Sequence, residues 1–223
     1  NGGLDGSVIT ATITVNAEAD TPSVTGATTN EDTQTTSGLV VSRNANDGTE
    51  VTHFKIISIT NGSLFQNDGT SAIASNDFIT FAQANAGLKF TPSTDFFGSG
   101  SFDVQASTSN MDAGLGGSTD TATITVNEVA DTPSVTDTTT DEDTQSSSGL
   151  VISRNVADGA EVTHFKITNI TNGALFRNNG TTAITNGDFI TFAIANAGLK
   201  FTPTAQFSGN GTFDIQSSLS NGD

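Results

Sequence analysis

The sequence predicts an all-β protein made of tandem β-sandwiches. Three observations support this fold class. The 223 residues repeat themselves with a period of 111 residues. Thr, Gly and Asn are abundant, which favours strands and turns over helices. Each repeat also holds short alternating runs separated by turn dipeptides, the usual signature of an all-β domain.

The internal repeat is the strongest of these features. Asp20–Val24 (DTPSV) recurs as Asp131–Val135. Aligned without a gap, residues 17–112 and 128–223 are identical at 65 of 96 positions. Neighbouring copies this similar are typical of long arrays of duplicated modules.

The phase of the repeat predicts the domain organisation. Residues 17–127 form one complete repeat, and residues 128–223 form a second repeat that stops before its final strand. Residues 11–15 (ATITV) match residues 122–126, the end of the first repeat. We therefore expect residues 1–16 to be the final strand of a preceding repeat.

The strands are expected where apolar and polar residues alternate. In Thr10–Val15, for example, Ala11, Ile13 and Val15 share one face. The further expected strands are residues 39–42, 51–59, 64–66, 78–81, 88–91 and 102–106. Asp68-Gly69 predicts a hairpin turn between Leu64 and Ile73.

One helical turn, Ala82–Ala86, is expected between the strands at residues 78–81 and 88–91. Seven or eight strands in each repeat are typical of a β-sandwich of immunoglobulin-like type. Phe is the only aromatic residue, so it is expected to dominate the core. The expected core aromatics are Phe54, Phe65, Phe78, Phe81, Phe90 and Phe102.

Composition and charge exclude several functions. The 24 acidic and 7 basic residues give a net charge of −17, which argues against nucleic acid or an anionic membrane surface as a partner. No apolar run is long enough for a membrane span. The chain has no Cys and only two His, which disfavours thiolate and histidine metal sites.

Acidic residues gather where successive repeats should join, and they predict Ca²⁺ binding. Ca²⁺ takes six to eight oxygen ligands, which strand ends and linkers can supply. Crowded carboxylates also repel one another, so a bound dication would relieve that repulsion. A solvated acidic rim is the alternative for any single carboxylate. The candidate ligands are Glu18, Asp20, Glu31, Asp32, Asp47, Asp112, Glu128, Asp131, Glu142, Asp143 and Asp158.

The remaining residues with reactive or metal-binding side chains are expected to have structural roles. His53 and His164 lie in an alternating run and are expected to be structural strand residues. Lys55 and Lys89 are expected to be exposed strand lysines rather than partners in isopeptide bonds. No nucleophile elbow, phosphate-binding loop or zincin motif is present, and the lack of Trp and Tyr argues against a sugar-cleaving cleft. We therefore expect no enzymatic activity.

Several runs of the sequence resemble a known family. These runs are residues 30–33 (NEDT), 46–48 (NDG), 51–56 (VTHFKI), 60–65 (TNGSLF), 87–92 (GLKFTP) and 119–126 (TDTATITV). Together they resemble the cadherin-like tandem repeats of very large bacterial surface and secreted proteins. Residues 78–90 also resemble the related chondroitin-sulfate-proteoglycan repeat.

The resemblance implies a calcium-rigidified β-sandwich that acts as a spacer or adhesive segment in surface attachment or biofilm. The ligands it implies are Glu31, Asp47, Glu128, Asp131, Glu142 and Asp158. We therefore expect a non-enzymatic, extracellular structural module of a surface-bound or secreted protein. Its partners would be neighbouring repeats, with a surface or a glycan as a further target.

A second expectation is a self-assembling extracellular fibre. Residues 8–16 are a strand without a module of its own, and the second repeat lacks the matching strand. Donation of this strand to the next identical chain, through the face of Ala11, Ile13 and Val15, would join chains head to tail. Binding of a carbohydrate on a loop surface is a third alternative, for which the sequence holds no pocket signature.

Overall fold

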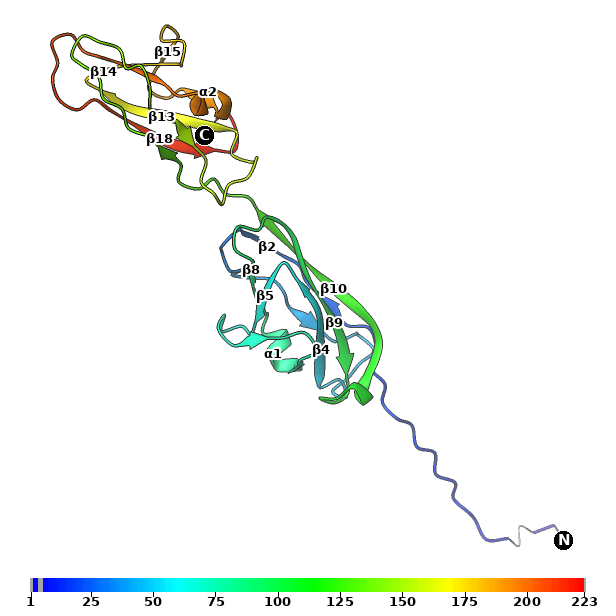
Figure 1. Cartoon of the computed structure of the whole chain (residues 1–223). Helices are drawn as coiled ribbons and strands as arrows, with labels where there is room; N and C mark the ends of the chain where they lie inside the picture. The colour runs from blue at the N-terminus through cyan, green and yellow to red at the C-terminus, as the bar shows by residue number, and fades with distance from the viewer. Residues whose placement is uncertain (1, 4–5, 223) are drawn as a thin grey trace. The chain divides into compact units, whose positions relative to one another are not determined.

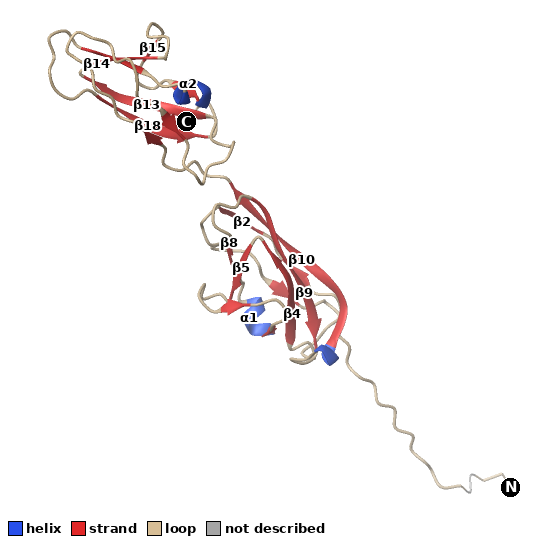
Figure 2. Cartoon of the chain, viewed as in Figure 1, coloured by secondary structure: helices blue, strands red, loops and turns tan. Residues whose placement is uncertain are grey.

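The computed structural model describes residues 2–3 and 6–222, and the fold is all-β, as the sequence predicts (Figure 2). It divides into two compact units. Unit 1 comprises the chain up to residue 93 and residues 98–126, and unit 2 comprises residues 94–97 and the chain from residue 127 on. Residues 1, 4 and 5 of the expected N-terminal strand segment and Asp223 of the second repeat lie outside the described residues.

Unit 1 is built around a five-stranded sheet (Figure 1). Strand β9 pairs antiparallel with β4 on one side and with β10 on the other. In this register, Phe102 lies opposite Ala122 on β10, and Ala106 lies opposite Phe54 on β4. The strand order is β2 (Ala27–Asn30), β10 (Leu115–Asn127), β9 (Gly98–Ser107), β4 (His53–Thr60) and β7 (Phe78–Thr80).

Two smaller sheets complete unit 1. One has the order β6 (Ala72–Ile73), β5 (Gly62–Phe65) and β8 (Lys89–Pro92), and the other pairs β1 (Ser23–Val24) with β3 (Val41–Ser42). A Cβ at Gly62 would lie 2.3 Å from Cζ of Phe90, and one at Gly100 would lie 2.7 Å from it. These two glycines therefore make room for the ring of Phe90, which is fully buried.

Unit 2 repeats this framework with fewer strands. Its main sheet has only three strands, in the order β16 (Phe189–Thr191), β13 (His164–Thr171) and β18 (Thr212–Ser218). Within the described residues, unit 2 has no counterpart of β10 or of its neighbour β2. The smaller sheets are β15 (Ala183–Ile184), β14 (Gly173–Phe176) and β17 (Lys200–Pro203), and β11 (Ser134–Val135) with β12 (Ile152–Ser153).

Local sequence explains the short helices, α1 (Phe81–Asn85) in unit 1 and α2 (Phe192–Asn196) in unit 2. Thr80 caps α1, and Gln83 completes a capping box with it. The expected helical turn is thus confirmed, one residue earlier than expected. The expected strand 78–81 ends at Thr80 because this cap starts the helix there. No helix of the described chain is long and apolar enough to cross a membrane.

The expected aromatic core is only half right. Phe54, Phe90 and Phe102 are fully buried, but Phe65, Phe78 and Phe81 are only partly buried. The guanidinium of Arg43 lies 3.7 Å from the centroid of the Phe81 ring, so a cation covers this aromatic face. Aliphatic residues such as Leu39, Ile56 and Leu88 occupy the rest of the core.

The hairpin between Leu64 and Ile73 forms as predicted, with these two residues paired. Oδ1 of Asp68 accepts hydrogen bonds from the backbone N–H groups of Thr70 and Ser71, and Oδ2 accepts one from the Ser71 hydroxyl. The side chain of Ser71 and these backbone donors lower the pKa of Asp68 from 3.8 to about 2.

This hairpin is expected to weaken in acid while its counterpart in unit 2 does not. Because the folded pKa of Asp68 is depressed, its contribution is present above about pH 4 and is lost as the pH falls towards about 2. Asn179 occupies the equivalent position and accepts the same backbone bonds without a titrating group. An NMR titration should place the Asp68 midpoint near 2, and a midpoint near 3.8 would contradict these bonds.

Candidate functional site

In each unit, a carboxylate accepts a hydrogen bond from the backbone of the segment that leads into the β-strands. In unit 1, the backbone N–H of Asp20 donates to both carboxylate oxygens of Asp47, at 3.0 and 3.3 Å. In unit 2, the N–H of Asp131 donates to Oδ1 of Asp158 at 2.9 Å. All four residues are candidate calcium ligands, and the structure brings each pair together. Their visible role is to fasten the entering segment to a loop.

Asp158 differs from Asp47 in one important respect. Asp158 is only 8 % exposed, and its Oδ2 is buried without a hydrogen-bond partner. Leaving a buried carboxylate oxygen without a donor is unfavourable. A hard cation supplies what this oxygen lacks, so Asp158 fits the role of a calcium ligand. Asp131 is adjacent, and Glu128 lies three residues before it in the same entering segment.

The remaining candidate ligands are not gathered with these pairs. Glu31 is 8 % exposed, and Asp143 is exposed and accepts two hydrogen bonds from Gln206. Among residues 2–3 and 6–222, no three His, Asp or Glu side chains are grouped so that they could hold a metal ion. The exposed candidates are Glu18, Asp20, Asp32, Asp112, Glu128, Glu142 and Asp143.

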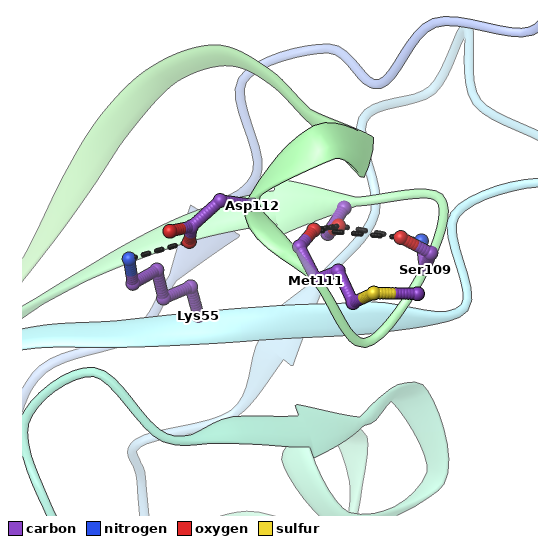
Figure 3. Close-up of polar contacts among 5 residues, drawn as sticks. Lys55, Ser109, Met111 and Asp112 are labelled. Carbon is purple, nitrogen blue, oxygen red and sulfur yellow. Dashed lines mark hydrogen bonds and ion pairs between the residues drawn. The ribbon is translucent and has the colours of Figure 1, made fainter.

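Asp112 instead forms an ion pair with Lys55 (Figure 3). The Lys55 Nζ lies 2.6 Å from Oδ1 of Asp112, and the side chains are 15 % and 72 % exposed. The expectation that Lys55 is an exposed strand lysine is therefore wrong. Lys55 lies on β4, and its Nζ lies 5.6 Å from the centroid of the Phe78 ring. Sequence reasoning missed this pair because the partners are 57 residues apart.

A different site emerges at the edge of the main sheet. In unit 1, strand β10 covers this edge with its inward face, where Ala122, Ile124 and Val126 are 0 %, 0 % and 3 % exposed. On the neighbouring strand β9, Phe102 and Val104 are fully buried as well. The apolar residues of this alternating strand therefore close the core on this side of unit 1.

In unit 2, the same edge is open. The main sheet ends at β18, which has no neighbour on that side within the described residues. Phe201, Phe213 and Ile215 pack against the core but remain partly exposed, whereas their unit 1 counterparts are fully buried. Strand β9 has ten residues and β18 has seven. The shorter length of β18 accompanies the lack of a described neighbour on that side, because a strand uses its neighbour to satisfy its backbone groups.

The N-terminal segment presents the complementary feature. The described residues 6–18 belong to no sheet and are exposed (Figure 1). Val8, Ile9, Ile13 and Val15 are 95 %, 91 %, 85 % and 86 % exposed. The alternating segment is thus extended but unpaired.

The two units allow a matched test of edge coverage in dilute solution. Phe102→Ala removes a fully buried ring and is expected to destabilise unit 1 by about 3–5 kcal/mol. Phe213→Ala should destabilise unit 2 by about half as much, because part of that ring is already in water. Hydrogen exchange resolved by strand measures the two effects separately. Equal losses in both units would contradict the difference in coverage.

Comparisons with known proteins supply little further information. No family model matches the chain, and no curated protein matches it. One similar solved structure is that of residues 27–141 of a conjugate transposon protein from Bacteroides vulgatus. It is 14 % identical, covers 52 % of this chain and 92 % of its own, and has a TM-score of 0.31.

Proposed function

We propose that the chain is a non-enzymatic structural segment of an extracellular surface or matrix protein, built of tandem β-sandwiches. The observation that carries this proposal is repetition of the whole framework. Two units share their strand order outside the open edge, their capped helix and their Asp-held entry. Catalysis seldom requires identical surfaces in tandem, whereas a spacer gains length from each copy.

The proposal includes Ca²⁺ at the entry of each unit. The strongest support is the buried Oδ2 of Asp158, which has no hydrogen-bond partner. Asp131 and Glu128 would supply further oxygens. In unit 1, Asp47 and Asp20 are the counterparts of Asp158 and Asp131, and Ala17 stands at the position of Glu128. A cation bound there would fasten the entering segment to its loop more firmly than one N–H bond does. The connection into the unit would then become stiffer.

The net charge of −17 has a second consequence under this proposal. Seven basic residues are too few to neutralise 24 carboxylates, so the chain repels itself at low ionic strength. A divalent cation reduces this repulsion wherever it binds. The extracellular medium provides Ca²⁺ at the concentrations at which sites of this kind bind it, about 0.1–1 mM.

Calcium is expected to stabilise unit 2 through Asp158. At 10 mM Ca²⁺, a site with a dissociation constant of about 0.1–1 mM adds about 1–3 kcal/mol. In a domain of this size, that raises the melting temperature by roughly 5–15 °C. Calorimetry with Ca²⁺, with Mg²⁺ and with EDTA measures the shift.

Two variants make this test specific. Asp158→Asn keeps the acceptor for the N–H of Asp131 but removes the charge, so the calcium shift should vanish. Asp137→Asn removes an exposed carboxylate elsewhere in unit 2 and should keep the shift. If Ca²⁺ leaves the melting temperature of the parent chain unchanged, or stabilises both variants equally, Asp158 is not a calcium ligand.

A further inference from the structure

We infer that Asn179 is a site of spontaneous deamidation, and that the hairpin of unit 2 binds the aspartate so formed as unit 1 binds Asp68. The inference concerns a covalent modification at the tip of the turn between β14 and β15 (Figure 1). The reaction requires water and no enzyme. It goes beyond the proposed spacer role, and it depends neither on calcium nor on contacts between chains.

The residue after Asn179 makes the reaction possible. Gly180 has no side chain to hinder its backbone nitrogen, so an asparagine before glycine cyclises readily. The nitrogen of Gly180 forms a bond to Cγ of Asn179 and loses its proton, while the bond from Cγ to Nδ2 breaks and ammonia leaves. Water then opens the succinimide ring. Opening at Cγ gives aspartate, and opening at the backbone carbonyl carbon gives isoaspartate.

The turn activates the amide carbon for this attack. Oδ1 of Asn179 accepts hydrogen bonds from the backbone N–H groups of Thr181 and Thr182, at 3.1 and 3.0 Å. Donors on a carbonyl oxygen stabilise the negative charge that develops there when a nucleophile adds to the carbon. The same two donors favour the addition of water at Cγ in the second step. Aspartate is therefore the expected main product.

The attacking nitrogen becomes available when the turn opens locally. The N–H of Gly180 donates to the backbone oxygen of Arg177 at 2.8 Å, and this bond must break first. The described side-chain bonds of Asn179 stay within three residues of it, since its Nδ2 donates to Oγ1 of Thr182 at 2.8 Å. Rotation of this side chain thus breaks no contact with a distant strand. Exposed turns of this kind open at a small cost in free energy.

Two other Asn–Gly pairs are held by distant strands and serve as internal references. The amide of Asn61 donates to the backbone oxygen of Ser99 on β9, at 2.9 Å. The N–H of Gly187, which follows Asn186, donates to the backbone oxygen of Ile167 on β13, at 2.8 Å. Both acceptors lie on the main sheets, so these sites open only when tertiary contacts are lost.

Unit 1 shows that the turn accommodates the product. One period earlier, Asp68 stands at the position of Asn179, and the glycine that follows has a φ of +71° in both turns. Oδ1 of Asp68 accepts two backbone N–H groups at 2.8 Å each, and its Oδ2 accepts the hydroxyl of Ser71 at 2.5 Å. An aspartate at position 179 would accept the equivalent donors, with the hydroxyl of Thr182 turning from acceptor to donor. A charged acceptor strengthens these bonds.

The conversion would change unit 2 in one direction only. Loss of ammonia to the solution makes the reaction irreversible, and it adds one negative charge to a chain whose net charge is already −17. The hairpin of unit 2 would also gain the sensitivity to acid that Asp68 gives the hairpin of unit 1. The fraction of converted chains would therefore increase with the age of the protein.

Peptide mass mapping of the intact chain during incubation in mildly alkaline buffer tests the inference. Asn179 is expected to convert about tenfold faster than Asn61 and Asn186, because its turn opens without loss of tertiary contacts. Fragmentation that distinguishes the two products should find more aspartate than isoaspartate. In a chain unfolded by guanidinium, the three sites should convert at similar rates, so the difference between the two conditions measures the effect of the fold.

Two variants test the site and its product separately. Asp68→Asn creates the same Asn-Gly-Thr tip in unit 1, and it should revert to aspartate at a rate similar to that of Asn179. Asn179→Asp supplies the product directly. It should slow the amide exchange of Thr181 and Thr182 severalfold and leave exchange in β13 and β18 unchanged.

Three results would overturn the inference. The first is an Asn179 that converts no faster than Asn61 and Asn186 in the folded chain. The second is isoaspartate as the main product, because the donors to Oδ1 then do not direct the reaction. The third is faster exchange of Thr181 and Thr182 in Asn179→Asp, because the turn then does not accommodate a carboxylate. None of these results bears on calcium binding, so the spacer proposal is tested independently.

Discussion

The core of unit 1 depends on one constraint: β10 must pair with the edge of β9, so that its apolar side chains extend the core-facing side of the main sheet. In unit 1, β10 meets this constraint with Ala122, Ile124 and Val126, and Phe102 beside Ala122 is fully buried. In unit 2, no strand of the described residues pairs with the equivalent edge of β18, and Phe213 is partly exposed. The two units share most of their sequence, and within the described residues their main sheets differ by the strands β10 and β2.

Two carboxylates stabilise the entry into the units by local hydrogen bonds. Asp47 and Asp158 hold the entering segments through backbone N–H groups, which is a structural role that needs no metal. Among the carboxylates that the structure describes, only Asp158 has a buried oxygen without a hydrogen-bond partner. Asp68 and Asp112, by contrast, have hydrogen-bond or ion-pair partners within the protein.

Local patterns in the sequence were sufficient for the all-β class, the hairpin at Asp68-Gly69 and the helical turn after Thr80. Contacts between distant residues could not be derived in this way. The ion pair of Lys55 with Asp112 and the stacking of Arg43 on Phe81 join positions whose proximity only the sheet register determines. The candidate calcium ligands were grouped by sequence, yet the described residues place most of them apart, because they lie in separate loops and turns outside the strands.

The constraint on the sheet edge is tested most directly by supplying the strand within one chain. The quantity to measure is the free energy of unfolding of unit 2 after the chain is lengthened beyond Asp223 by a copy of residues 113–127. Burial of the added Ala, Ile and Val side chains should raise the stability of unit 2 by about 3–5 kcal/mol, towards that of unit 1. Unchanged stability of unit 2, with Phe213 still accessible to solvent, would contradict the claim that a missing strand sets the difference between the units.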